Sequence, residues 1–326
     1  MLADHWVIAQ IIGQVSSFFL ILIALLHSAT IIHNWDPASA SEKQLLLERK
    51  TYLVSTLIKY VLIFQVVSLI LFLVTANNHL PGLIKGAMCA TGTLSVNSYG
   101  YPYLYLKNFS VIVYIVFLFI NYLDQSEPEY PLTPLKFWFI PLIFLLISAD
   151  LVLLLFYFLN IEPDIIATCC SISFSVSNRL DTGVLSGGSI VDWLIPVFYF
   201  IAVLIAAAIY KKKDLLAFFL SLVFIPVAVY LLKYHYVKFI YALPTHNCLF
   251  DIFWKDYFYI GYILFGALFI IPVALILNLL INFFQQKLSK NYFTLSKHLR
   301  YTALTSTISY VMLVSGYWIY WIVFRL

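Results

Sequence analysis

The sequence predicts an all-α polytopic membrane protein with about eight transmembrane helices, and three observations support this prediction. Hydrophobic residues make up 63% of the 326 residues, and the mean hydropathy is +0.95. Charged residues make up only 10%, whereas a soluble domain carries roughly a quarter and needs them to cover its surface. Tyr and Trp gather at the ends of apolar runs, which is typical of the aromatic belts at membrane interfaces.

An apolar run of ~20 residues is long enough to cross a hydrocarbon core of ~30 Å. The first such run follows a segment without Lys or Arg, so it lacks the positive region of a secretory signal and predicts a retained helix. No internal repeat or low-complexity linker separates the runs, which predicts a single transmembrane helical domain over residues 1–326. The predicted spans are 6–32, 52–76, 103–123, 137–159, 190–210, 215–234, 259–284 and 301–324.

The distribution of Lys and Arg predicts the orientation, because cytoplasmic loops carry an excess of both. One set of loops holds eleven of these residues, including the turn Lys211–Lys213, whereas the opposite set holds seven, among which Lys107 is counted. We therefore expect both termini and the three longer loops, about 77–102, 161–189 and 241–258, on the non-cytoplasmic side. The expected location is a bacterial inner membrane, with these three loops forming a small cap.

All four cysteines fall in the three longer loops, and none lies in a predicted span. They are Cys89, the adjacent pair Cys169 and Cys170, and Cys248. A non-cytoplasmic compartment permits disulfides. A bond between neighbouring cysteines is strained, so the two remaining pairings would join Cys89 and Cys248 to the adjacent pair and staple the loops together.

Thiol–disulfide exchange is a second interpretation of the same cysteines. A thiolate attacks a disulfide, and the electrons pass to an exported redox protein or to a quinone. Membrane thiol oxidoreductases use a C-x-x-C pair near a helix end, and this chain has none.

A thiolate-bound metal is the third interpretation. His79 and His246 lie in the cysteine-bearing loops, and His246 is two residues from Cys248. Thiolate and imidazole together suit Zn²⁺ or Cu⁺, so His79, His246 and Cys248 are candidate metal ligands. The spacing matches no standard zinc motif, and a single histidine beside a proline turn is also ordinary loop chemistry.

Asp150 is the most informative polar residue within a predicted span. A charge at mid-bilayer costs ~2.5–3.5 kcal/mol on insertion scales, so Asp150 should face the bundle interior and be paired or protonated. It predicts either a proton or cation relay or a buried acid that fixes helix register. Lys59 either extends to the inner headgroups or reaches toward Asp150, and Gln65 lies at a similar depth.

The sequence contains no Walker loop, dinucleotide-binding glycine motif or metalloprotease motif. We therefore expect the loop cysteines to handle thiol–disulfide exchange or a thiolate-bound metal, in the maturation of exported redox proteins. The alternatives are a non-catalytic membrane subunit of a larger electron-transfer or transport complex with structural disulfides, and a proton-coupled transporter that uses Asp150. The expected partners are the lipid bilayer and an exported redox protein or other membrane subunits, with no nucleic acid. Whether the protein is an enzyme is left open.

Overall fold

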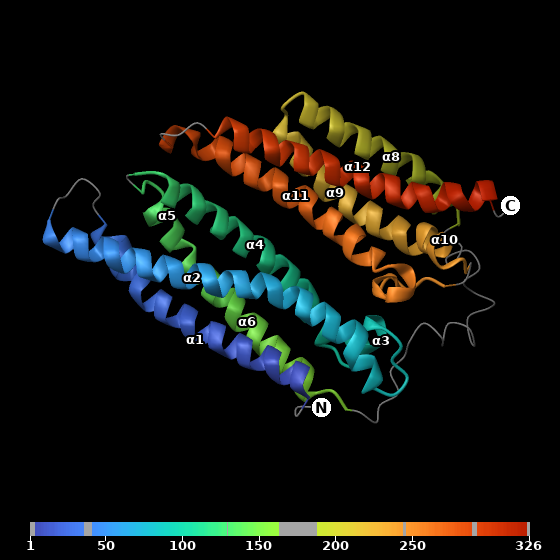
Figure 1. Cartoon of the computed structure of the whole chain (residues 1–326), viewed down its shortest axis with the longest axis horizontal. Coiled ribbons are helices and arrows are strands. Elements are labelled where there is room, and N and C mark those ends of the chain that lie inside the picture. The colour runs from blue at the N-terminus through green and yellow to red at the C-terminus, as the bar shows by residue number, and fades with distance from the viewer. Residues whose placement is uncertain are drawn as a thin grey trace. The chain divides into compact units, whose positions relative to one another are not determined.

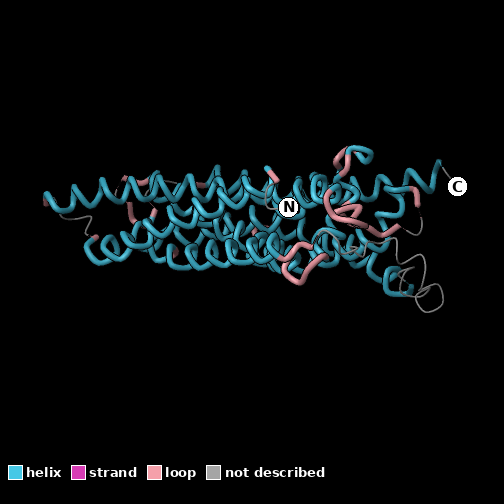
Figure 2. Tube along the Cα trace, turned by 90° about the horizontal axis from the view of Figure 1, so that it is seen from below, coloured by secondary structure: helices cyan, strands magenta, loops and turns pink. Residues whose placement is uncertain are grey.

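The computed structural model confirms the all-α multi-pass fold. It describes residues 4–35, 41–128, 130–162, 188–243, 246–288 and 292–324, and none of these forms a strand (Figure 2). Eight helical segments are long and apolar enough to cross a membrane. They are His5–Asn34, Glu42–Gly82, Gly100–Ser126, Thr133–Leu159, Ile190–Tyr210, Asp214–Tyr241, Ile260–Lys287 and Phe293–Val323.

The described chain forms two compact units. Whether they act as the single domain that the sequence predicts stays a prediction. Unit 1 comprises Met1–Lys85, Thr93–Ala167 and Phe284–Asn291. Unit 2 comprises Gly86–Gly92, Thr168–Phe283 and Tyr292–Leu326.

Unit 1 is a helical bundle (Figure 1), in which four long helices contact one another. Helix α1 packs against α2 and α6, and α4 packs against the same two helices. The side chain of Asp4 caps the start of α1, and that of Ser41 caps the start of α2. Helix α2 continues through a π-helical turn, η1 (Thr75–His79), and a 3₁₀ turn, η2 (Leu80–Gly82). The helices are α1 (His5–Asn34), α2 (Glu42–Val74), α4 (Gly100–Ser126), the short α5 (Thr133–Trp138) and α6 (Ile140–Leu159).

Unit 2 has an aromatic core in which Phe198 stacks on Phe224, with ring centroids 5.1 Å apart. Tyr310 contacts both rings edge-on. All three side chains are fully buried, so this core holds three helices together. The elements are α8 (Gly188–Tyr210), α9 (Asp214–Leu231), η4 (Leu232–Tyr236), α10 (Val237–Tyr241), η5 (Asp251–Phe253), η6 (Lys255–Tyr257), α11 (Ile260–Phe284) and α12 (Phe293–Phe324). Two further short elements, α3 (Ala90–Ser95) and η7 (Gln285–Lys287), complete the described chain.

A single carboxylate joins three helices of unit 2. Arg300 of α12 donates from Nε and Nη2 to the two oxygens of Asp214, at 2.8 Å and 2.6 Å. The amide of Asn282 on α11 donates to the same carboxylate at 2.9 Å. Because Asp214 is the first residue of α9, this two-pronged pairing fixes the ends of α9, α11 and α12 to one another.

Candidate functional site

A glycine-bounded turn places Cys89. Gly86 has a φ of 81°, a left-handed conformation that glycine adopts without strain. A Cβ on Gly92 would lie only 3.0 Å from the Cα of Ala87, so a larger residue would crowd the backbone there. The turn therefore closes tightly on itself, and it leaves Cys89 just before the first residue of α3 with 1% of its surface exposed.

A second segment, between α10 and α11, places Cys248 and Asp251. The hydroxyl of Tyr241 donates to the backbone carbonyl of Cys248 at 2.7 Å. Asp251 opens the 3₁₀ turn η5, which packs closely on the start of α11: a Cβ on Gly261 would lie 2.8 Å from the side chain of Ile252. Two anchors, one on each neighbouring helix, thus hold this segment.

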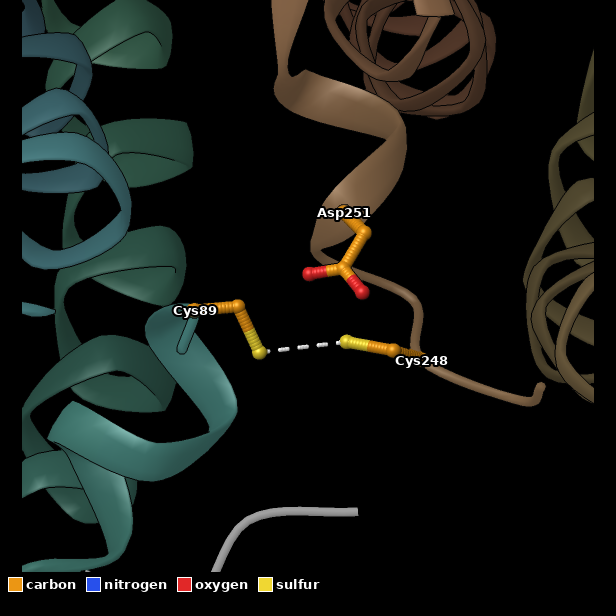
Figure 3. A group of neighbouring side chains, drawn as sticks. All are labelled: Cys89, Cys248 and Asp251. Atoms are coloured by element: carbon orange, nitrogen blue, oxygen red, sulfur yellow. Dashed lines mark hydrogen bonds between the residues drawn. The ribbon is translucent and has the colours of Figure 1, made fainter. Parts of the chain in front are cut away.

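The two segments bring two thiols and a carboxylate together within unit 2 (Figure 3). The Sγ atoms of Cys89 and Cys248 lie 3.2 Å apart, although 159 positions separate the residues in the chain. The hydroxyl of Thr91 lies 3.6 Å from the Sγ of Cys248. One ligand atom each from Cys89, Cys248 and Asp251 lies within 4.8 Å of the others. Three groups that bind cations therefore share one place.

The electrostatics of this cluster oppose ionisation of the Cys89 thiol. The hydrogen bond with Cys248, burial, and the negative charges of Cys248 and Asp251 raise the pKa of Cys89 well above its usual value. Both cysteines are nearly inaccessible, with 1% and 2% of their surfaces exposed. Without a cation, Cys89 is therefore a neutral thiol at physiological pH.

His246 contacts the carboxylate of Asp251. Its Nε2 lies 2.6 Å from the Oδ2 of Asp251, and its ring meets the ring of Tyr241 edge-on at 4.6 Å. An imidazole in this place orients the carboxylate, as outer partners orient the ligands of metal sites.

A buried ion pair occupies the interior of unit 1. The Nζ of Lys107 on α4 lies 3.6 Å from the Oδ2 of Asp150 on α6, and both side chains are fully buried. The hydroxyl of Tyr114 donates to the same oxygen at 3.3 Å. This pairing matches the expectation that Asp150 is buried and paired.

Amide side chains extend the ion pair across the bundle. Lys107 donates to the Oε1 of Gln65, whose Nε2 donates to the Oε1 of Gln14 at 3.0 Å. Gln14 in turn lies 3.4 Å from the backbone carbonyl of Ile147. One polar chain thus crosses α1, α2, α4 and α6, the four long helices of unit 1.

Comparisons with known proteins find no relative. No protein-family model, no curated protein and no solved structure matches this chain. Its function is therefore inferred from the chemistry of its own residues.

The structure redistributes the residues that the sequence singled out for metal binding. The sulfur of Cys248 contacts that of Cys89. The sequence analysis instead favoured bonds from these two cysteines to Cys169 and Cys170, because a bond between neighbouring cysteines is strained. Cys169 and Cys170 lie outside the described residues. His246 contacts Asp251 rather than a thiol.

His79 belongs to unit 1, where its Nε2 lies 2.7 Å from the Oδ2 of Asp4. Burial opposes ionisation of Asp4, but the hydrogen bonds from His79 and from the backbone of Val7 and Trp6 lower its pKa overall. His79 therefore serves the capped start of α1, and its prediction as a metal ligand stays a prediction.

Two residues of these clusters escaped the sequence analysis. Asp251 gave only a weak signal, its position three residues after Cys248. Lys107 was counted as an outer-loop charge, but it lies inside α4 and is fully buried. Lys59, which the sequence offered as a partner for Asp150, is exposed instead. The signal for Lys107 was available, since it falls inside the predicted span 103–123.

Proposed function

We propose that this multi-pass membrane protein binds a thiophilic metal ion, Zn²⁺ or Cu⁺ in class, through Cys89, Cys248 and Asp251. The observation that supports the proposal is the meeting of two buried thiols and a carboxylate from distant segments. Thiolate ligands select soft and borderline cations of this kind. Three protein ligands would leave a fourth tetrahedral position for a water molecule or another small ligand.

The surroundings favour metal binding over thiol exchange. Exchange needs a thiolate that a partner can reach, whereas both thiols are buried and the charge of Asp251 opposes ionisation of Cys89. A cation reverses that balance, because it stabilises all three anionic ligands at once. Two sulfurs on one tetrahedral Zn²⁺ lie about 3.7 Å apart, given Zn–S bonds of ~2.3 Å. The observed 3.2 Å lies between that separation and the ~2.05 Å of a disulfide, so the two sulfurs need to move apart by about 0.5 Å to bind the ion.

We place this site on the non-cytoplasmic side of a bacterial inner membrane, and the lysine-rich turn Lys211–Lys213 supports that placement. An ion held there would serve the maturation of exported redox proteins, which are the partners we expect. Labelling of Lys211–Lys213 by a membrane-impermeant reagent added outside intact cells would contradict this sidedness.

Metal analysis of the purified protein tests the proposal. We expect about one equivalent of Zn or Cu by elemental mass spectrometry, and its loss in Cys89→Ser, Cys248→Ser and Asp251→Asn. His246→Ala should retain the site but bind about 10–100-fold more weakly, as outer-shell variants do. Asp256→Asn is the matched control, because this exposed carboxylate lies outside the cluster.

The oxidation state of Cys89 and Cys248 tests metal binding against a structural disulfide or thiol–disulfide exchange. Mass spectrometry on unreduced protein should find Cys89 and Cys248 as thiols in the metal-loaded form. A disulfide between them, in protein that takes up neither ion after reduction, would overturn the metal proposal in favour of a structural staple or exchange chemistry.

The Lys107–Asp150 pair favours a second candidate, a proton-coupled transporter. A fully buried ion pair on two facing helices is a place where a proton can be taken up or released during transport. In proteoliposomes with an imposed pH gradient, we expect uptake of Zn²⁺ or Cu⁺ by the wild type. The double variant Lys107→Met/Asp150→Leu, which removes both charges together, should be folded and inactive; undiminished uptake would assign the pair a purely structural role.

A further inference from the structure

Unit 1 contains a cavity of about 470 Å³ at the end where α1 and α2 meet the junction of α4 and α5. This volume is within the range of small-molecule sites. Its walls combine polar and aromatic side chains. The lining residues used below are Trp35, Arg49, Thr51, Ser55, Tyr130 and Lys136.

Three buried polar atoms among these residues lack a hydrogen-bond partner in the described part of the chain. They are the Nε1 of Trp35 and the hydroxyl oxygens of Thr51 and Ser55. Thr51 and Ser55 are 5% and 1% exposed, and their spacing of four residues puts them on one face of α2. Buried polar groups almost always have a partner, and a ligand bound among these three residues would supply one.

The three unpaired groups are all able to donate a hydrogen bond, so their ligand should carry acceptor atoms. The indole N–H can only donate, and each hydroxyl can donate one hydrogen bond. The lining also carries the guanidinium of Arg49 and the ammonium of Lys136. Lys136 is held in place by Asp124, at 2.6 Å, and this carboxylate also offsets part of its positive charge. Among the described lining residues Glu48 is the one acid, and its side chain accepts a hydrogen bond from Gln44.

The location of the cavity indicates that the ligand also has an apolar part. The cavity lies near the starts of two candidate membrane-spanning segments, Glu42–Gly82 and Thr133–Leu159, and we expect such ends at the depth of lipid headgroups. The rings of Trp35 and Tyr130 line the same space and suit the boundary between headgroup and acyl chain.

We infer that this cavity binds a phosphate monoester or diester, with Arg49 and Lys136 facing its charge and Trp35, Thr51 and Ser55 donating to its oxygens. A phosphate offers enough acceptor oxygens for all five groups, and Arg binds it through two donors. The phosphate can belong to an anionic phospholipid headgroup or to a soluble phosphate ester, and the experiment separates these two sources.

The test measures binding to the full-length protein in detergent by native mass spectrometry and thermal shift. The probes are dioleoylphosphatidylglycerol, its phosphate-free counterpart dioleoylglycerol, and sn-glycerol 3-phosphate. We expect the phosphate-bearing lipid to bind and dioleoylglycerol not to bind. Binding of the lipid alone assigns a headgroup site, and comparable binding of glycerol phosphate assigns a site for soluble esters.

Variants locate the binding. Arg49→Gln should weaken phosphate binding by about tenfold, because it removes a charge-assisted pair. Thr51→Val/Ser55→Ala should weaken it without loss of folding, since it replaces orphaned hydroxyls with apolar groups. Lys43→Gln is the matched control, an exposed cation on the same stretch of α2 that does not line the cavity. Equal binding of dioleoylglycerol, binding of neither phosphate, or unchanged binding in both variants would overturn the inference.

Discussion

Lys107→Met should lower the stability of unit 1 by about 3–5 kcal/mol, the usual cost of removing one member of a buried ion pair. The substitution keeps the length of the side chain but removes the ammonium. The carboxylate of Asp150 and the amide oxygen of Gln65 then lose a partner in a region that water does not reach. We expect a clear drop in the melting temperature, followed by tryptophan fluorescence in detergent.

A double variant distinguishes charge from packing. Lys107→Met/Asp150→Leu removes both charges, so it should recover much of the stability that either single change loses. Lys59→Met is the control, because Lys59 is an exposed lysine on a helix of the same unit. A Lys107→Met protein that melts at the temperature of the wild type would show that the pair contributes nothing.

Metal removal should destabilise the wild type and leave Cys89→Ser unchanged. An ion present at a hundred times its dissociation constant stabilises the fold by about 2.7 kcal/mol, because it binds only the folded protein. We expect a chelator to lower the melting temperature of the loaded wild type, and re-addition of Zn²⁺ or Cu⁺ to restore it. A chelator effect of equal size in Cys89→Ser would place the stabilising ion elsewhere.

The pH dependence of metal binding has a definite sign. The hydrogen bond with Cys248, burial and the charge of Asp251 raise the pKa of Cys89 in the metal-free protein, so the thiol holds its proton until a cation displaces it. Binding that displaces one proton from each of two thiols weakens by about a hundredfold for each unit by which the pH falls. Metal-dependent stability should therefore be lost toward acid. Titration of metal occupancy between neutral and mildly acidic pH measures the slope.

Hydropathy predicted the number of spanning helices but not their ends. Helix α2 begins at Glu42 and α12 at Phe293, several residues before the predicted spans at 52 and 301. Apolarity detects the part of a helix that lies in hydrocarbon, whereas the charged first turns stay helical in the headgroup region. Capping by Ser41 marks the true start of α2, and that signal is visible in the sequence.

The composition of the candidate site was partly predictable, but its assembly was not. Cysteine placement identified Cys89 and Cys248, because cysteines are few and all avoid the predicted spans. Their meeting depends on how a turn before α3 packs near a segment after α10, and no local pattern encodes such a contact. Lys107 shows the same limit: its partner is set by the packing of α4 on α6, which hydropathy cannot report.

The three-helix anchor at Asp214 has a consequence for motion in unit 2. Helix α9 with its continuation to Tyr241 spans 28 residues, or about 40 Å at 1.5 Å per residue. Arg300 and Asn282 fix one end of this helical segment. We therefore expect the largest displacements at its other end, after which Cys248 and Asp251 follow in the chain. Small rotations about that fixed end would change the separation of the Cys248 and Cys89 sulfurs, which is 3.2 Å in this structure.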